Sequence, residues 1–332
     1  KNNMNPENFE REQGEQTSLE QRLEALPVNQ REKLEASWKT LEELTPKGEL
    51  PEGVIISKVE HEDAESTKTK VAEMQDFLKK AFEGEEMVDE MQMEIGLQHK
   101  IVDYYGARDA EGKLITLLSS NSVETKTESG QSELSMVVWY VANREGYKGK
   151  SVVKEVAAAG LSDFLKRAKQ ELKPVKAILG ETELGDDDAV RRERAFNRYA
   201  GMKRVYGKDK NGKLSEVLYE APPEDESTKG APANFMVRLI DGRDTLSKEE
   251  YMSIVKGIHS QYSRPEYFTS EYFAFLEEGD PKDFPQEDVD KYRQRYLGIT
   301  EKIQQKIEKK LKPVQGDLVL LSEREKRKGA EE

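Results

Sequence analysis

The chain has 332 residues, of which 35% are hydrophobic and 36% are charged, and its net charge is −13. This charge argues against general nucleic-acid binding, which needs a basic face, and the absence of cysteine excludes disulfides, a cysteine nucleophile and a thiolate metal site. No apolar run approaches the length of a membrane span, and no signal peptide is visible, so we expect a cytoplasmic protein without membrane partners. The first residue is Lys rather than Met, which is compatible with removal of an upstream segment.

Residues 1–50 are expected to form a disordered start followed by amphipathic helices. Residues 1–16 are polar. Apolar residues then recur at near-helical spacing, interrupted by Pro27: Leu19, Leu23, Leu26, Leu34, Trp38, Leu41 and Leu44. We expect two helices that end near Pro46 and Gly48 and pack against the main domain or a partner chain. A homodimer through such helical extensions is one expectation.

Residues 51–222 have the pattern of an α/β domain with a mixed sheet. The expected elements in chain order are a strand at 53–60, helices at 71–82 and 85–99, a hairpin at 101–120, a strand at 134–142, a helix at 152–172, a strand at 176–184, a helix from about 188 to 202 and a hairpin at 205–220. Asp109 to Gly112 and Asn211-Gly212 are the expected hairpin turns. This alternation predicts a mixed sheet with helices on its faces.

The last third of the chain is expected to be a separate, mostly helical extension. Residues 223–233 have the composition of a linker, residues 234–321 are mostly helical after one strand at 234–240, and residues 322–332 form a charged tail. The extension carries a dense group of aromatic residues: Tyr262, Tyr267, Phe268, Tyr272, Phe273 and Phe275. This density is typical of a small core, and a helical element here could also cover one end of a substrate cleft.

The turn between the expected strand at 134–142 and the following helix combines glycine with positive charge. It contains Gly146, Gly149, Arg144, Lys148, Lys150 and Lys154. The N-terminus of a helix presents unpaired backbone N–H groups and a partial positive charge, and nearby lysines strengthen such an anion site. The sequence therefore predicts a phosphate-binding turn, with an ordinary connection carrying solvated lysines as the alternative.

One candidate ligand for this turn is a nucleoside triphosphate. Gly149-Lys150-Ser151 matches the end of a phosphate-binding loop between a strand and a helix. Arg144, however, stands where that motif needs its first glycine, and the next strand offers Glu181 and Glu183 rather than an aspartate for magnesium. A nucleotide-binding protein is therefore the third-ranked interpretation.

Two segments resemble the GNAT superfamily of N-acyltransferases. Tyr147 to Lys154 is similar to the family's Tyr-Arg-Gly-Lys-Gly-Ile-Gly-Lys segment, with Lys148 in the arginine place, Gly149 matching, and Ser151 and Val153 at two small positions. Phe196 to Met202 is similar to the family's Phe-Tyr-x-x-x-Gly-Phe segment after the fifth strand. The resemblance covers about residues 53–220 and implies a GNAT-like fold with helical extensions at both ends.

The resemblance also implies a site for acetyl-CoA as co-substrate. In the family, the fourth and fifth strands separate and the pantetheine arm enters the gap. By resemblance, the residues that bind the arm and the pyrophosphate are Trp139, Tyr140, Val141, Lys148, Gly149, Lys150, Ser151, Val152, Val153 and Lys154. Asn197 occupies the place of the family's thiolate-donating tyrosine, so it can bind the sulfur or the pantetheine but cannot act as an acid.

The candidate catalytic residues are Glu181, Glu183 and Tyr199. Glu181 and Glu183 are two apart on one expected strand, so they point to the same face, where one could take the proton of an attacking amine. Alternatively, they are solvated or paired with the arginines of the following segment. Tyr199 lies two residues before Gly201, about 200° around a helix from the family's donor position.

The sequence thus predicts an N-acyltransferase that moves an acetyl group from acetyl-CoA to a small-molecule or protein amine by direct attack. The alternative is a non-catalytic binding or interaction module with the same fold, because Asn197 and Val153 depart from the family pattern. No metal is expected, since His61, His99 and His259 lack metal-ligand spacing and each is interpreted as a surface or packing residue.

Overall fold

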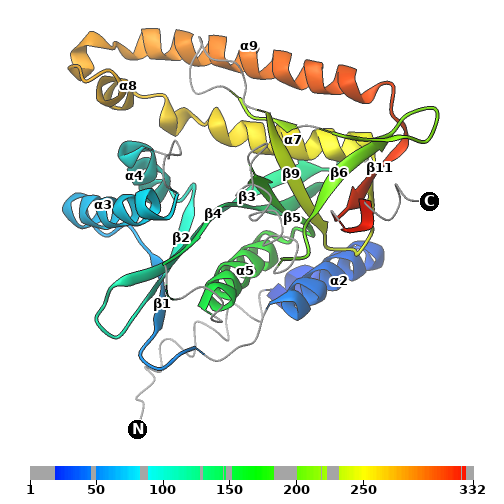
Figure 1. Ribbon diagram of the computed structural model, residues 1–332, viewed down its shortest axis with the longest axis horizontal. Helices are drawn as coiled ribbons and strands as arrows, with labels where there is room; N and C mark the ends of the chain where they lie inside the picture. Colours follow the sequence, from blue (N-terminus) through cyan, green and yellow to red (C-terminus); the bar gives the residue numbers. More distant parts are fainter. Residues whose placement is uncertain are drawn as a thin grey trace.

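The protein is built around one large mixed sheet with helices on both faces (Figure 1). The computed structural model describes residues 19–45, 50–82, 89–127, 130–144, 146, 152–182, 200–217, 219–222, 232–322 and 324–326. Over these residues the strands follow the order β1-β2-β3-β4-β5-β9-β6-β11-β10, with β7 paired to β6 and β8 paired to β9. All neighbouring strands are antiparallel except β4 and β5, which are parallel.

The strands range from two residues in β8 and β10 to 13 residues in β3. They are β1 (Ile55–Val59), β2 (Asp103–Arg108), β3 (Leu114–Lys126), β4 (Ser132–Asn143), β5 (Val175–Thr182), β6 (Lys203–Lys208), β7 (Leu214–Glu216), β8 (Tyr219–Glu220), β9 (Pro232–Leu239), β10 (Thr245–Leu246) and β11 (Gln315–Leu321). The helices are α2 (Val28–Leu44), α3 (Ala64–Ala81), α4 (Glu90–Gln98), α5 (Val152–Glu171), α7 (Lys248–Tyr262), α8 (Ser270–Leu276) and α9 (Gln286–Leu311), with two 3₁₀ turns, η2 (Pro265–Tyr267) and η3 (Pro281–Asp283). None of the described helices is long and apolar enough to cross a membrane.

Polar side chains fix where several of these helices begin. The carboxylates of Asp63 and Asp89 accept backbone N–H bonds at the starts of α3 and α4. Ser247 and Glu250 form a reciprocal capping box at the start of α7. These caps satisfy N–H groups that have no partner within the helix, so the helix starts follow directly from the sequence.

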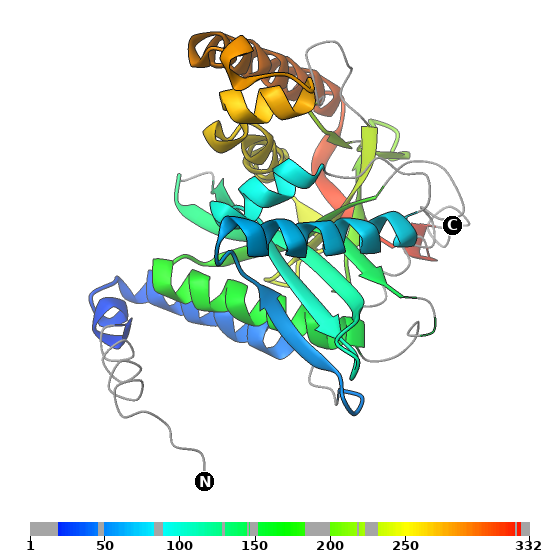
Figure 2. The same cartoon turned by 90° about the vertical axis from the view of Figure 1, so that its left-hand side faces the viewer.

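Strand alternation divides the side chains between two faces of the sheet. On β2, Tyr104 packs with α3 and α4, whereas Tyr105 packs with α5. On β4, Val137 belongs to the cluster with α7, whereas Val138 belongs to the cluster with α5 and α2. We call these the α7 face, covered by α3, α4 and α7, and the α5 face, covered by α5 and α2. Figure 2 shows α2 and α5 side by side on the latter.

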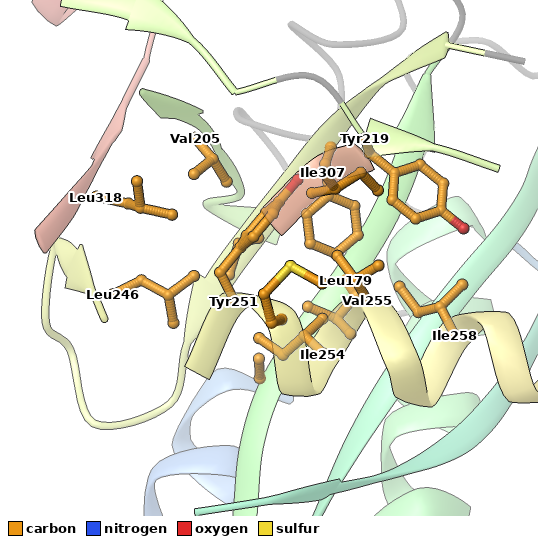
Figure 3. Packing of buried hydrophobic residues seen from close by; sticks show 14 of the residues in the cluster. Leu179, Val205, Tyr219, Leu246, Tyr251, Ile254, Val255, Ile258, Ile307 and Leu318 are labelled. Carbon is orange, nitrogen blue, oxygen red and sulfur yellow. The ribbon is translucent and has the colours of Figure 1, made fainter. Parts of the chain in front are cut away.

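The core of the α7 face is centred on Leu179 of β5 and is fully enclosed. Figure 3 shows Leu179 surrounded by side chains of β8, α7 and α9, among them Tyr219, Tyr251, Val255 and Ile307. Leu179, Tyr219, Tyr251 and Val255 are each 0% exposed. Side chains from residues 246–311 therefore complete the core over the central strands.

The N-terminal helix α2 packs against the main sheet, one of the two alternatives expected from the sequence. The indole N–H of Trp38 donates to the backbone carbonyl of Lys173 over 3.0 Å, and Lys33 forms an ion pair with Glu133 of β4 over 2.6 Å. The hydroxyl of Ser37 accepts the backbone N–H of Val175 over 3.1 Å, just where β5 begins. Helix α2 thus anchors the start of β5.

Both predicted hairpins are confirmed. The N–H of Gly112 donates to the carbonyl of Asp109, and that of Gly212 donates to Asp209, at 2.9 Å in each case. Both glycines have positive φ, +78° and +79°, which other residues adopt at a cost. The first hairpin joins β2 to β3, and the second joins β6 to β7.

The sheet continues past residue 222, where the sequence analysis ended the GNAT-like domain. Strand β9, predicted at 234–240, lies between β5 and β6 and pairs with both. Strand β11, in a segment expected to be mostly helical, was not predicted and pairs with β6. The central strands thus depend on residues from beyond the expected linker at 223–233. Residues 223–231 of that linker lie outside the described residues. The domain boundaries themselves remain a prediction.

Candidate functional site

The parallel strands β4 and β5 separate partway along their length. Their pairing runs from Leu134 opposite Val175 to Val138 opposite Gly180 and ends there. Strand β4 nevertheless continues to Asn143, still paired with β3, and β5 continues to Thr182, still paired with β9. The two strands therefore form a wedge that opens beyond Val138, as the family resemblance predicted.

A β-bulge marks the point of separation. Tyr140 of β4 lies opposite Ser119 of β3, whereas Val138 lies opposite Ser120, so Trp139 is the extra residue on β4. The hydroxyl of Ser119 accepts the backbone N–H of Tyr140 over 3.1 Å and so holds the bulge. A bulge bends its strand and increases its twist, which gives a physical reason for β4 to leave β5 here.

The bulge also changes the burial of the strand. Residues 133–138 of β4 are buried, whereas 139–141 are partly exposed. The ring of Trp139 meets that of Tyr262 edge to face at 5.7 Å between centroids, and Tyr140 meets Phe82 in the same way at 6.0 Å. Val141 packs on the α5 face. Of the three residues expected along the pantetheine arm, two therefore point to the α7 face and one to the α5 face.

A cavity of about 650 Å³ adjoins the open part of β4 on the α7 face. Strands β2, β3 and β4 contribute its floor, including Tyr104, Asn121 and Trp139. Helix α4 and the segment from the end of α7 to α9 contribute the remaining described walls, among them Tyr262 and Tyr272. The C-terminal helical segment lies against this cavity, and its role in covering a substrate cleft stays a prediction. All of the predicted aromatic residues except the exposed Phe275 both pack in the core and line the cavity.

Glu181 lies on β5 just beyond the last pair with β4. Residues two apart on a strand point to the same face. Because Leu179 belongs to the core of the α7 face, the side chain of Glu181 faces that side too. The residue is partly exposed, but its Oε1 atom is buried and has no hydrogen-bond partner among the described residues. Burial raises the pKa of this carboxyl from 4.5 to about 7, and the Tyr219 hydroxyl opposes the shift.

Two tyrosines that the sequence analysis did not identify lie near Glu181. Tyr219 of β8 and Tyr251 of α7 are fully buried, and neither hydroxyl has a hydrogen bond of normal geometry within the described part of the chain. Burial, and then the charge of Glu181, raises the pKa of both phenols, so both stay protonated. Nothing local in the sequence places either tyrosine beside Glu181.

Helix α5 begins at Val152, close to the predicted start near Lys150. Val152 is 0% exposed and Val156 is 0% exposed, and both pack against β2 and β3. Lys154 is exposed in the first turn of the helix. The rest of the predicted phosphate-binding turn, Lys148, Gly149, Lys150 and Ser151, lies outside the described residues, as do Glu183, Asn197 and Tyr199.

His259 is a packing residue, as predicted for each histidine. It is 0% exposed, its Nε2 lies 3.0 Å from the carbonyl of Glu220, and Gln304 lies 3.3 Å from its Nδ1. Burial lowers its pKa to about 4, so the imidazole is neutral at pH 7. Within the described ranges, no group of three or more His, Asp or Glu is placed to hold a metal ion.

Comparisons with known proteins give matches among solved structures. No family model and no curated protein sequence matches the chain. An aminoglycoside acetyltransferase from an uncultured soil metagenomic sample is 13% identical, with 44% of this chain and 89% of that one covered at a TM-score of 0.33. A GNAT-family protein from Desulfovibrio desulfuricans is 9% identical, with 56% and 99% covered at 0.37, and Arabidopsis thaliana NAA60 in complex with acetyl-CoA is 8% identical, with 57% and 99% covered at 0.37.

The structures that the chain resembles thus come from the family that the sequence motifs resemble. Identities and scores this low carry no argument about activity. The fold class is that predicted, a mixed α/β sheet with helical segments before and after it. The features that bear on function are therefore the wedge between β4 and β5, the cavity beside it and the buried carboxylate of Glu181.

Proposed function

We propose that the protein is an N-acyltransferase that transfers an acetyl group from acetyl-CoA to an amine by direct attack. The single observation that supports this most is the end of β4–β5 pairing at Val138 and Gly180 while both strands continue. Neighbouring parallel strands are held together by evenly spaced backbone hydrogen bonds. Where this pairing ends, the backbone N–H and C=O groups on the β5-facing edge of β4 can bind a ligand in place of β5.

The described residues fit the pantetheine part of acetyl-CoA. An extended amide chain can pair with an open strand edge in the same way as an added β-strand. Beyond Val138, the β5-facing edge of β4 has no strand partner within the described ranges, and Trp139 and Val141 flank it on opposite faces. The pyrophosphate would be held by Lys148, Gly149, Lys150, Ser151, Val152, Val153 and Lys154, by family resemblance.

Acetyl-CoA supplies an activated thioester, whose carbonyl carbon the amine attacks. A C–N bond forms, the C–S bond breaks, coenzyme A leaves as the thiol, and the acceptor ammonium gives up two protons, one of them to the departing sulfur. The chain needs to supply a proton acceptor and an environment that excludes bulk water. Asn197 would contact the sulfur or the pantetheine, and Tyr199 remains a candidate donor to the thiolate.

Glu181 is the proposed proton acceptor, and Glu183 is the second candidate. A general base works best when its pKa lies near the working pH, and burial brings the pKa of Glu181 to about 7. The carboxylate lies on the α7 face, which also carries the cavity, at the point where β5 leaves β4. Glu181 does not itself line the cavity, so we propose that it accepts the proton of the amine through water.

Calorimetric titration with acetyl-CoA and with ATP plus magnesium tests the proposal. Binding of acetyl-CoA, with release of free thiol when an amine is added, is the expected result. Binding without thiol release from a broad amine panel would support the non-catalytic module instead. Preference for ATP would overturn the proposal in favour of nucleotide binding. Sedimentation of the same sample tests the expected homodimer.

A further inference from the structure

The cavity beside β4 has a composition that restricts what it can bind. Ten of the 19 described residues that line it are aromatic. Its volume of about 650 Å³ lies within the usual range for sites that hold small organic molecules. The aromatic rings of the wall give binding free energy to a ligand with an apolar body.

The charged groups of the cavity are all negative among the residues described. Asp89 and Glu277 line it, and the described lining contains no lysine, arginine or histidine. Two arginines outside the lining contact rings of its wall: Arg293 lies 5.9 Å from the Phe268 ring centroid and donates to the carbonyl of Ser263, and Arg295 lies 5.9 Å from the Tyr292 ring centroid. Carboxylates and ring faces both attract a cation, and both repel an anion.

The position of Asp89 is fixed by the fold. One carboxylate oxygen caps α4 by accepting the N–H of Gln92 over 2.6 Å, and the other accepts the hydroxyl of Tyr272 over 2.9 Å. The second bond joins α4 to α8 across the cavity. The negative charge is therefore held in place before any ligand arrives, which reduces the ordering cost of binding a cation.

We infer, on the basis of the proposed function, that the acceptor is a small primary amine carried by an aromatic or extended apolar body. The cavity binds the protonated amine through Asp89, Glu277 and the ring faces, and the apolar body fills the space between α4 and α8. The negative lining disfavours acceptors with a carboxylate or phosphate.

Direct binding tests the cavity without any acyl donor. The chain has two tryptophans, Trp38 buried in α2 and Trp139 in the cavity wall, so a Trp38→Phe variant reports on the cavity by fluorescence. Phenethylamine is expected to change this signal saturably, and the uncharged 3-phenylpropan-1-ol is expected to bind about tenfold more weakly because it lacks the cation. No saturable signal with phenethylamine, or equal binding of the alcohol, overturns the inference.

Matched substitutions in α8 place the effect in the cavity. Phe273 lines the cavity, and Phe275 on the same helix is 45% exposed and does not. Phe273→Ala is expected to weaken phenethylamine binding about tenfold, and Glu277→Gln about threefold, while Phe275→Ala changes it less than twofold. Equal effects of both phenylalanine substitutions in folded protein would contradict a role for the cavity.

Turnover with acetyl-CoA separates this inference from the proposed function. Phenethylamine is expected to exceed spermidine, kanamycin and a peptide with an N-terminal Phe by at least about tenfold in kcat/KM. Thiol release with spermidine, kanamycin or the peptide as the best acceptor would overturn the inference and leave the proposed function standing. Cavity binding of phenethylamine with no affinity for acetyl-CoA would overturn the proposed function and the acceptor role with it, and would leave only the amine-binding chemistry of the cavity standing.

Discussion

The two halves of the β4–β5 pair differ in composition, burial and charge. In the closed half, Leu134 to Val138 pair with β5, and the apolar side chains of both strands are buried on both faces of the sheet. In the open half, the strands part at Trp139, side chains are partly exposed, and Glu181 keeps a buried oxygen without a hydrogen bond. The closed half of the strand pair thus contributes mainly to the stability of the fold, whereas the open half carries the groups that could take part in a reaction.

Carboxylates at the two ends of the pair show this difference most directly. At the closed end, Lys176 of β5 pairs with Glu250 of α7 and lies 3.9 Å from Glu133 of β4. Burial raises the pKa of Glu250, but hydrogen bonds from Arg243, Lys176 and the Ser247 N–H outweigh it and bring the pKa to about 2. The pKa of Glu181 at the open end is instead raised to about 7. The carboxylate of Glu250, which is paired with cations, stabilises the fold. The carboxyl of Glu181 has no cation partner among the described residues, and its raised pKa suits it to proton transfer.

The largest expected effect on stability comes from the closed half. Leu179→Ala removes a side chain that is 0% exposed at the centre of the α7-face core, so we expect a loss of about 3 kcal/mol in the free energy of unfolding. Urea denaturation followed by circular dichroism measures the loss. Trp139→Ala, in the open half, is the matched control, and a loss as large as that of Leu179→Ala would contradict the division between halves.

The next effect is on catalysis and comes from Glu181. Glu181→Gln is expected to lower kcat about 100-fold, because the amide cannot accept the amine proton. In the unsubstituted protein, kcat/KM is expected to rise with pH through about 7, as the carboxyl loses its proton, and the variant is expected to lose this inflection. Thiol release measured from pH 5.5 to 9 gives both results.

Stability provides the control for Glu181→Gln. The folded protein holds the Glu181 proton up to about pH 7, whereas the unfolded chain releases it near 4.5, so this group's contribution to stability is lost as pH rises through 7. The substitution is therefore not expected to lower the free energy of unfolding at pH 8. A clear destabilisation at pH 8 would assign Glu181 a structural role.

A smaller effect is expected at the closed end, with the opposite dependence on pH. Glu250→Gln removes the partner of Lys176 and Arg243, so we expect a loss of about 2 kcal/mol at pH 7. The folded pKa of about 2 lies below the unfolded value of 4.5, so the contribution is present above pH 4.5 and is lost as pH falls toward 2. Denaturation at pH 7 and pH 3 tests this, and an unchanged difference at pH 3 would be inconsistent with it.

The smallest effect is expected at the bulge. Ser119→Ala removes the acceptor of the Tyr140 N–H and loosens the point where the strands part. We expect about a fivefold increase in the KM for acetyl-CoA with kcat changed less than twofold. The neighbouring Ser120→Ala serves as the control, because Ser120 flanks the same bulge opposite Val138 but does not accept the Tyr140 N–H. Equal effects of the two substitutions would contradict the proposed role of the Ser119–Tyr140 hydrogen bond in acetyl-CoA binding.

Local sequence signals predicted the parts of the fold that local interactions determine. The apolar run at 134–142, the helix at 152–172 and the two Asp-and-Gly turns all appear in the structure. Strand β11 escaped prediction because QGDLVLL is short, begins with polar residues and gains its stability from the distant β6. The insertion of β9 between β5 and β6 is likewise decided by pairing across long separations in sequence.

The candidate site was predictable only where local sequence signals determine it. Trp139 and Tyr140 follow from the family motif, and Glu181 follows from its place on β5. Burial raises the pKa of Glu181, and the Tyr219 hydroxyl opposes this shift. Tyr219 and Tyr251 reach the carboxylate from β8 and α7, and no local sequence signal indicated this. The aromatic group after residue 260 did not distinguish core from cavity in the sequence, because in the structure the same rings serve as both.

The insertion of β9 has a consequence for synthesis on the ribosome. Strand β5 leaves the exit tunnel about 50 residues before β9, its permanent neighbour, and β6 waits more than 100 residues for β11. During that interval, the nascent chain carries two unsatisfied strand edges that attract other chains. The sheet therefore stays incomplete until β11 has left the tunnel, and its open edges need protection during that interval.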